Sequence, residues 1–176
     1  MCLRDEICTG RSTKPISALA QQINQAISMI DAIDDLTFLK HANGTGSVGE
    51  QFRHCLDFVN TFLKGIAIGQ IDYSKRERDQ RVEKDRSYAV SKFEASLFQL
   101  GTILDNRLNG AVSVRSEFGS AAWLISSVAR ELDFDFSHTV HHHALIAEKL
   151  VGFGISVDAS FGVSPSTAEY RRSLAA

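Results

Sequence analysis

The feature that most constrains the fold of this chain is a series of apolar residues repeated at helical spacing near its N-terminus. Between residues 16 and 33 they recur at i, i+3, i+4 and i+7, which is the spacing of one buried helix face. Pro15 comes just before the series, in the first helical turn where proline is tolerated. We therefore predict a helix from about Thr13 to Ile33. Its apolar face would consist of Ile16, Leu19, Ala20, Ile23, Ala26, Ile27, Ile30 and Ile33.

Three more long helices are predicted from similar signals. Ser47 and Glu50 have the spacing of a capping box, which opens a helix from Ser47 to about Ile68. A third helix is predicted from roughly Arg86 to Asn106, and a fourth from about Glu131 to Phe153, ending at Gly154. The predicted apolar positions of these helices are Phe52, Cys55, Leu56, Val59, Phe62, Leu63 and Ile66, then Phe93, Leu97, Leu100 and Leu104, then Phe136, Val140, Ala144, Ala147 and Val151.

The segments between the helices are polar or prone to form strands. Residues 34–46 are expected to form a connection with room for one short turn, and the charged residues 69–86 can fold over the end of a bundle. Residues 111–125 predict a β-hairpin, and Ser164-Pro165-Ser166 can start a short final helix. The expected fold is an all-α, antiparallel four-helix bundle with a small hairpin insertion, in a single domain over residues 1–176.

Composition narrows the classes of function. The chain has 176 residues and a formal net charge of -2, which argues against a broad nucleic-acid or anionic-membrane surface. No apolar run approaches the roughly 20 residues that cross a bilayer, and the N-terminus lacks the apolar region of a signal peptide. The odd set Cys2, Cys8 and Cys55 suggests reduced thiols, with Cys55 packed in the core. We expect a cytoplasmic protein with no nucleic-acid or membrane partner.

Histidines supply the strongest indication of chemistry. In a helix, His138 and His142 lie one turn apart, so their imidazoles can converge on one metal ion. His54 from the second helix would complete a three-nitrogen site with open coordination positions. Such a site suits an ion that binds water or substrate better than it suits a closed structural zinc.

The same histidines also allow an interpretation that involves no metal ion. The histidines can instead form a solvated or partly packed polar helix face. His138 and His142 lie nearly opposite the apolar stripe predicted for their helix, but Glu131 and Leu145 share that face, so it is not simply exposed to solvent. His141, at i+3 from His138, is the competing second ligand and also a candidate fourth ligand.

Several stretches, in this order and spacing, resemble the DinB-like (YfiT-like) superfamily. They cover the chain from about residue 15 to the C-terminus and comprise Ser47–Asp57, Ile71–Tyr73 with Arg76, Arg78 and Asp79, Arg130–Leu132, Ser137–Ile146 and Phe161–Thr167. The resemblance implies an up-down-down-up four-helix bundle that is often dimeric. It also implies a divalent metal, commonly nickel or zinc, held by one histidine of the second helix and a later H-x-x-x-H pair. These ligands map to His54, His138 and His142.

The resemblance leaves the supporting residues and the activity open. Similar proteins are often richer in histidine around the second helix, where this chain has Gln51 and Phe58. Characterised relatives include transferases and isomerases that use low-molecular-weight thiols, together with proposed metal-dependent hydrolases. We therefore expect a small-molecule substrate or a low-molecular-weight thiol as partner, and a homodimer.

Two hypotheses about function follow. In the first, the chain is a metalloenzyme whose ion activates a bound water or thiol, and Asp57 or Glu131 orients a ligand or moves a proton. In the second, it is a non-catalytic, stress-associated metal-binding dimer. For the enzyme, the loop of residues 71–79 could border the metal centre, where Arg76 and Arg78 would pair with a substrate carboxylate. The alternatives are surface carboxylates and a solvated loop held by internal salt bridges.

Overall fold

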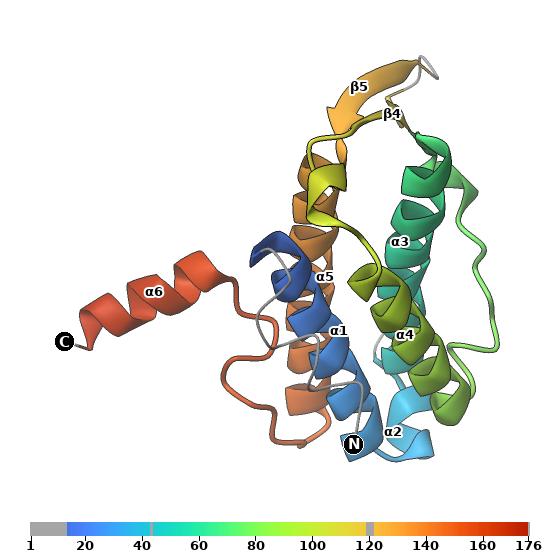
Figure 1. Cartoon of the computed structure of the whole chain (residues 1–176). Helices are drawn as coiled ribbons and strands as arrows, with labels where there is room; N and C mark the ends of the chain where they lie inside the picture. Colours follow the sequence, from blue (N-terminus) through green and yellow to red (C-terminus); the bar gives the residue numbers. More distant parts are fainter. Residues whose placement is uncertain (1–13, 43, 119–121, 176) are drawn as a thin grey trace.

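Four long helices form the body of the protein in the computed structural model, which describes residues 14–42, 44–118 and 122–175. The helices are α1 (Lys14–Ala32), α3 (Val48–Ile68), α4 (Arg86–Gly101) and α5 (Val128–Gly152). Helices α1 and α3 each pack against both α4 and α5. Figure 1 shows α1 and α5 running in one direction and α3 and α4 in the other. The predicted up-down-down-up bundle is therefore confirmed.

Parallel α3 and α4 require a connection that returns along the whole bundle. The connecting residues 69–85 do so, and Figure 1 shows them descending beside α3. This connection contains strand β3 (Gln70–Ile71) and the 3-10 turn η1 (Tyr73–Lys75). Ile71 and Tyr73 are buried, so the connection is anchored to the bundle and does not simply fold over its end.

A small sheet covers the end of the bundle at which α3 ends and α5 begins. The predicted hairpin is present as β4 (Ala111–Arg115) and β5 (Trp123–Ser127), which pair in antiparallel fashion. Strand β3 adds to β4 in parallel orientation, which the sequence pattern did not predict. The turn predicted between the two hairpin strands falls partly outside the described residues.

At the opposite end, the connection predicted for residues 34–46 contains more structure than one turn. It forms α2 (Asp35–Leu39), then β1 (His41–Ala42) and β2 (Thr45–Ser47), which pair in antiparallel fashion. Asp34 caps α2, since its side chain accepts a hydrogen bond from the backbone N–H of Thr37. The protein thereby enters α3 directly from β2.

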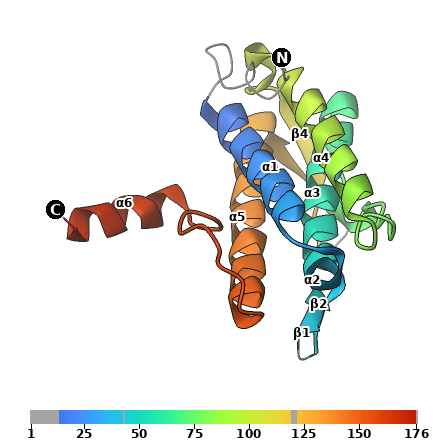
Figure 2. The same ribbon diagram turned by 90° about the horizontal axis from the view of Figure 1, so that it is seen from below.

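Two predicted helix boundaries were wrong. Helix α4 ends at Gly101, before the predicted Asn106, because Leu104 is 65% exposed and does not continue the buried stripe that ends at Leu100. Helix α5 begins at Val128, before the predicted Glu131, because Ser127 at the end of β5 caps it. A 3-10 turn, η2 (Asp105–Arg107), follows α4, and α6 (Pro165–Leu174) projects away from the bundle (Figure 2).

The buried face of α5 also differs from the prediction. Val140 is buried, but Ala144 is exposed and Val151 is 62% exposed, so the predicted apolar stripe is wrong. The face of α5 that is buried contains polar as well as apolar residues. A search for periodic apolar residues therefore did not identify it. Its residues are Val128, Glu131, Leu132, Asp135, Thr139, Val140, His143, Ile146 and Leu150.

None of the helices in the described part of the chain combines the length and the apolar character of a membrane-spanning segment. Cys55 is a buried free thiol, as predicted. Cys2 and Cys8 lie outside the described residues.

Candidate metal centre

Two adjacent helices hold the three predicted ligands. His54 lies in the second turn of α3, whose start is held by the predicted capping box: Ser47 Oγ accepts from the Glu50 N–H at 3.1 Å, and Glu50 Oε2 accepts from the Ser47 N–H at 2.8 Å. His138 and His142 lie one turn apart on α5, which packs against α3. The three side chains therefore come from rigid elements.

The three imidazole rings converge. The ring centres of His54 and His138 are 5.1 Å apart, and each lies 4.5 Å from the ring centre of His142. One nitrogen from each ring can be chosen so that all three lie within 4.8 Å of one another, a spacing that allows one ion to be held between them.

The rings are also in the right protonation state to bind a cation. Burial lowers the pKa of His138 to about 3 and that of His142 to about 4, with further lowering by neighbouring charges. Burial and the charge of Arg76 likewise lower the pKa of His54. All three imidazoles are therefore neutral near pH 7, and each keeps a lone pair for a metal ion.

The competing ligands do not join this group. His141 is exposed, and its ring packs edge-on against His142 at 5.3 Å between centres. Cys55 is buried and burial raises the pKa of its thiol, which disfavours the thiolate needed for coordination. Within the described ranges, no fourth histidine, cysteine, aspartate or glutamate completes the cluster.

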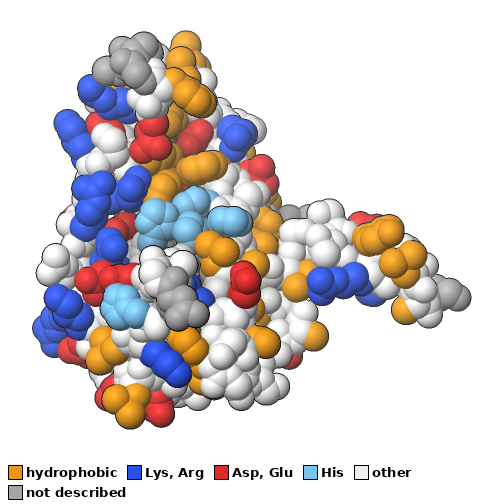
Figure 3. Space-filling view, turned by 180° about the vertical axis from the view of Figure 1, so that it is seen from behind, with side chains coloured by type: hydrophobic (Ala, Val, Ile, Leu, Met, Phe, Trp, Pro, Cys, Tyr) orange, Lys and Arg blue, Asp and Glu red, His pale blue; other side chains and the backbone are white. Residues whose placement is uncertain are grey.

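The histidines reach the surface of the bundle. Figure 3 shows a patch of histidine side chains in the middle of one face, with basic side chains on one side and hydrophobic side chains beside it. All three predicted ligands are half-buried. A small molecule can therefore approach the rings from this face.

Comparisons with known proteins agree with this architecture. A DinB-like protein from Bacillus subtilis superposes with a TM-score of 0.63 at 17% identity, covering 87% of this chain and 99% of that one. A DinB-like protein from Bacillus cereus ATCC 10987 superposes with a TM-score of 0.52 at 15% identity, covering 80% and 91%. This chain has the DinB-like fold.

The matches found by sequence cover less of the chain than the matches found by structure. No protein-family model matches this chain. FK506-binding protein 5 of Rhizopus delemar is 30% identical over 104 residues, which are 57% of this chain. The match covers only 27% of that longer protein, so its activity does not transfer to this chain.

Gln51 and Phe58 contact two of the three candidate histidine ligands, a role that the sequence left open. Nδ1 of His142 lies 2.8 Å from Gln51 Oε1, and because an amide oxygen only accepts, the imidazole donates. That bond leaves Nε2 of His142 as the nitrogen with a free lone pair. Phe58 stacks on His138 with ring centres 3.9 Å apart. In the sequence, this role of Gln51 could have been recognised from its position one turn before His54 on the same helix.

Replacing Gln51 with alanine should weaken metal binding by roughly 10- to 100-fold, which is the usual effect of removing a partner that orients a ligand. The Gln51→Glu variant is the matched control, since its carboxylate can accept the same hydrogen bond. Competition with a chromophoric chelator measures both affinities. Equal affinities in Gln51→Ala and the unmodified protein would show that Gln51 does not orient His142.

Asp57 and Glu131 do not join the histidines. Asp57 pairs with Arg53 at 2.9 Å and accepts from the backbone N–H of Arg78 at 3.1 Å. Glu131 is buried and accepts hydrogen bonds from Ser126 Oγ at 2.6 Å and from the Tyr73 hydroxyl at 3.2 Å. Both carboxylates therefore attach the 69–85 connection to the bundle, and Glu131 also attaches the sheet.

A buried carboxyl that the sequence pattern did not reveal is Asp135. It is 0% exposed, lies one turn before His138 on α5, and neither of its oxygens has a hydrogen-bond partner among the described residues. Burial, together with the negative charge of Glu131, raises the pKa of Asp135 well above its usual value. The raised pKa favours the neutral acid form of Asp135 in the folded protein.

The raised pKa of Asp135 makes the stability of the folded protein depend on pH. Above about pH 4 the unfolded chain ionises Asp135 while the folded chain keeps its proton, so the folded state binds more protons and stability falls as pH rises. The fall approaches about 1.4 kcal/mol per pH unit until Asp135 ionises in the folded state. We expect the free energy of unfolding of Asp135→Asn, relative to that of the unmodified protein, to be larger at pH 7.5 than at pH 5. Chemical denaturation with metal removed measures it. The exposed Asp133, changed to asparagine, is the control. A gain that is the same at both pH values would contradict a neutral Asp135.

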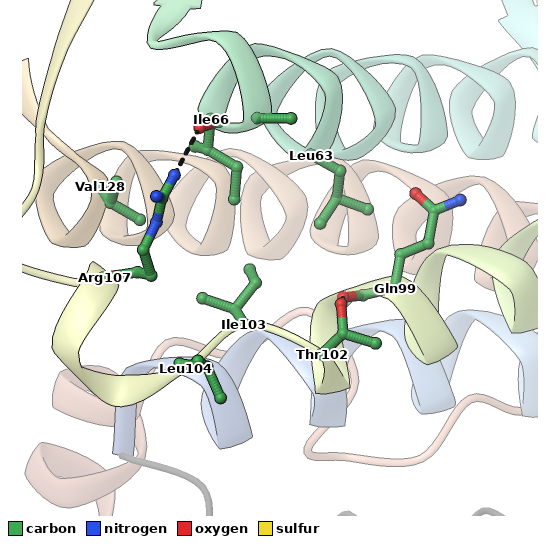
Figure 4. Close-up of a pocket in the computed structure, with 9 residues that line it drawn as sticks. Leu63, Ile66, Gln99, Thr102, Ile103, Leu104, Arg107 and Val128 are labelled. Atoms are coloured by element: carbon green, nitrogen blue, oxygen red, sulfur yellow. Dashed lines mark hydrogen bonds between the residues drawn. The ribbon is translucent and has the colours of Figure 1, made fainter.

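A separate cavity lies elsewhere in the bundle. It has a volume of about 320 Å³ and lies where α3 and α4 end and α5 begins (Figure 4). Its walls include Leu63, Ile103, Val128 and Arg107, which donates to the carbonyl of Ile66 at 3.1 Å. None of the three histidines lines it, so it is not part of the metal centre.

Proposed function

We propose that this protein binds one divalent metal ion through His54, His138 and His142 and uses it as the centre of a metalloenzyme of thiol-transferase or hydrolase type. The observation that carries the proposal is the convergence of three neutral imidazoles with no fourth protein ligand in the described parts of the chain. Catalytic sites keep such an open position, whereas structural zinc sites are closed by four protein ligands.

The residues fit a metal ion in two further respects. Nδ1 of His138 is buried without a hydrogen-bond partner among the described residues, which is unfavourable unless that ring contacts another group. His142 is oriented by Gln51, as ligating histidines usually are by a carboxylate or carbonyl acceptor. Three nitrogen ligands suit zinc or nickel, the two metals that we propose.

The chemistry follows from the open position. A divalent ion held here supplies a positive charge that lowers the pKa of a bound water or thiol towards neutrality. The residues of this chain orient the ligands and limit access of water: Gln51 holds His142, while Phe58 covers one face of His138. We propose a small-molecule substrate or low-molecular-weight thiol as partner, in a cytoplasmic homodimer.

The first test is elemental analysis of protein purified without a histidine tag. We expect about one zinc or nickel ion per chain, in keeping with a single three-histidine site. The second test replaces the ion with cobalt(II), whose visible spectrum reports its coordination. Addition of 2-mercaptoethanol should change that spectrum if a position is open. A metal-free protein that cannot be loaded would exclude the proposal, and a spectrum insensitive to added ligands would instead favour a non-catalytic metal-binding protein.

A further inference from the structure

Arg76, in the connection between α3 and α4, lies close to the candidate metal centre. The sequence places it more than twenty residues from His54, but the returning connection brings it back along the bundle. Its guanidinium carbon lies 4.5 Å from the centre of the Phe58 ring, and that ring lies 3.9 Å from His138. The guanidinium can be no farther from the His138 ring than the sum of these distances, which is within the span of a small substrate.

Arg76 has no close carboxylate partner among the described residues, and the nearby Asp57, whose charge also acts on it, is paired with Arg53. The neighbouring Arg53 is paired with two carboxylates, Asp57 at 2.9 Å and Glu83 at 2.6 Å. Arg76 instead meets the exposed carboxylate of Glu117 at 3.8 Å, which is longer than a hydrogen bond. Its Nη1 donates to the carbonyl of Tyr73, whereas its buried Nε has no partner among the described residues. The guanidinium is thus held in place while it still has N–H groups that can donate a hydrogen bond to a ligand.

The centre as a whole has an excess of positive charge. The three ligands are neutral imidazoles, so a bound divalent ion would keep its full charge, and no carboxylate among the described residues joins the ligand group. Arg76 adds a further positive charge close to this centre, since its guanidinium lies against the Phe58 ring that stacks on His138. In a partly buried site of low dielectric constant, such an excess strongly favours an anionic ligand.

We propose that Arg76 binds a carboxylate group of the substrate at this centre, an inference that rests on the proposed metal site. The substrate would be a small molecule with a metal-binding atom and a carboxylate separated by only a few bonds. A single guanidinium matches a singly charged planar anion, which it can bind through two parallel hydrogen bonds. The aromatic ring of Phe58 holds the guanidinium from one face.

Two small thiols of similar length test this assignment on the cobalt-loaded protein. Mercaptoacetate carries a carboxylate and 2-mercaptoethanol carries a neutral hydroxyl at the corresponding end. The ratio of their dissociation constants, taken from the change in the cobalt spectrum, measures the contribution of the carboxylate. We expect Arg76→Gln to reduce the preference for mercaptoacetate by roughly 10- to 100-fold, the usual range for a hydrogen bond to a charged group.

Arg78→Gln is the matched control, since it removes the same charge from an exposed position two residues away. It should leave the preference within about twofold of that of the unmodified protein, as expected for an exposed charge. Arg76→Lys keeps the charge but loses the planar fork, and should retain part of the preference. Unchanged binding of 2-mercaptoethanol by Arg76→Gln shows that the metal centre is intact. An unchanged ratio in Arg76→Gln overturns the assignment, whereas failure of the unmodified protein to bind cobalt defeats the proposed metal site itself.

Discussion

The His142→Ala variant should remain folded but lose most of its metal. His142 is half-buried on α5, and alanine is the best helix former, so helical content should be preserved. Removing the ring leaves two imidazoles, one from each helix. Because loss of even an outer partner costs roughly 10- to 100-fold in affinity, loss of a ligand should cost more. Elemental analysis and circular dichroism measure the two properties on the same sample.

His141→Ala is the natural control for this experiment. His141 is the adjacent histidine, but it is exposed and stands outside the converging group. Its removal should leave metal content unchanged. If His141→Ala lost the metal while His142→Ala kept it, the H-x-x-x-H assignment would be wrong and His138 would pair with the residue at i+3.

The Gly162→Ala variant should be destabilised by about 3 kcal/mol or more, from two causes that act together. Gly162 has a φ of +71°, a conformation that residues other than glycine adopt only at a cost. An added Cβ would also lie 2.6 Å from the Cα of Ala144 and would be closer still to its backbone nitrogen. The backbone of α5 cannot move aside as a flexible side chain can. Chemical denaturation measures the loss.

Gly154→Ala separates these two causes. Gly154 has a similar φ of +81°, but a Cβ added there would meet nothing within 4 Å, so only the backbone cost of about 1 kcal/mol is expected. Gly162→Ala should also disturb the neighbouring Phe161, whose ring stacks on the buried His143 at 4.5 Å. Similar losses in the two variants would show that the 161–164 segment can move away from α5.

Local patterns predicted most of the bundle. The capping box placed the start of α3 correctly, since Ser47 and Glu50 interact within one turn and need no tertiary contact. The apolar stripe of α1 was right because every position that it named is buried. The stripe of α5 was wrong because Asp135, Thr139 and His143 occupy core positions. A buried histidine such as His143, which meets Gln22 at 3.2 Å, cannot be told from an exposed one by polarity alone.

The sequence by itself determined which residues could form the centre, because i, i+4 spacing places His138 and His142 on one side of any helix. It also determined the rigid helix that carries His54. Only the tertiary structure decided that the two helices pack side by side with these rings facing one another, that Gln51 meets His142, and that Arg76 returns to the centre. Each of these contacts joins residues far apart in sequence. The packing of the whole bundle fixes the contacts, and the local periodicity of the sequence does not reveal that packing.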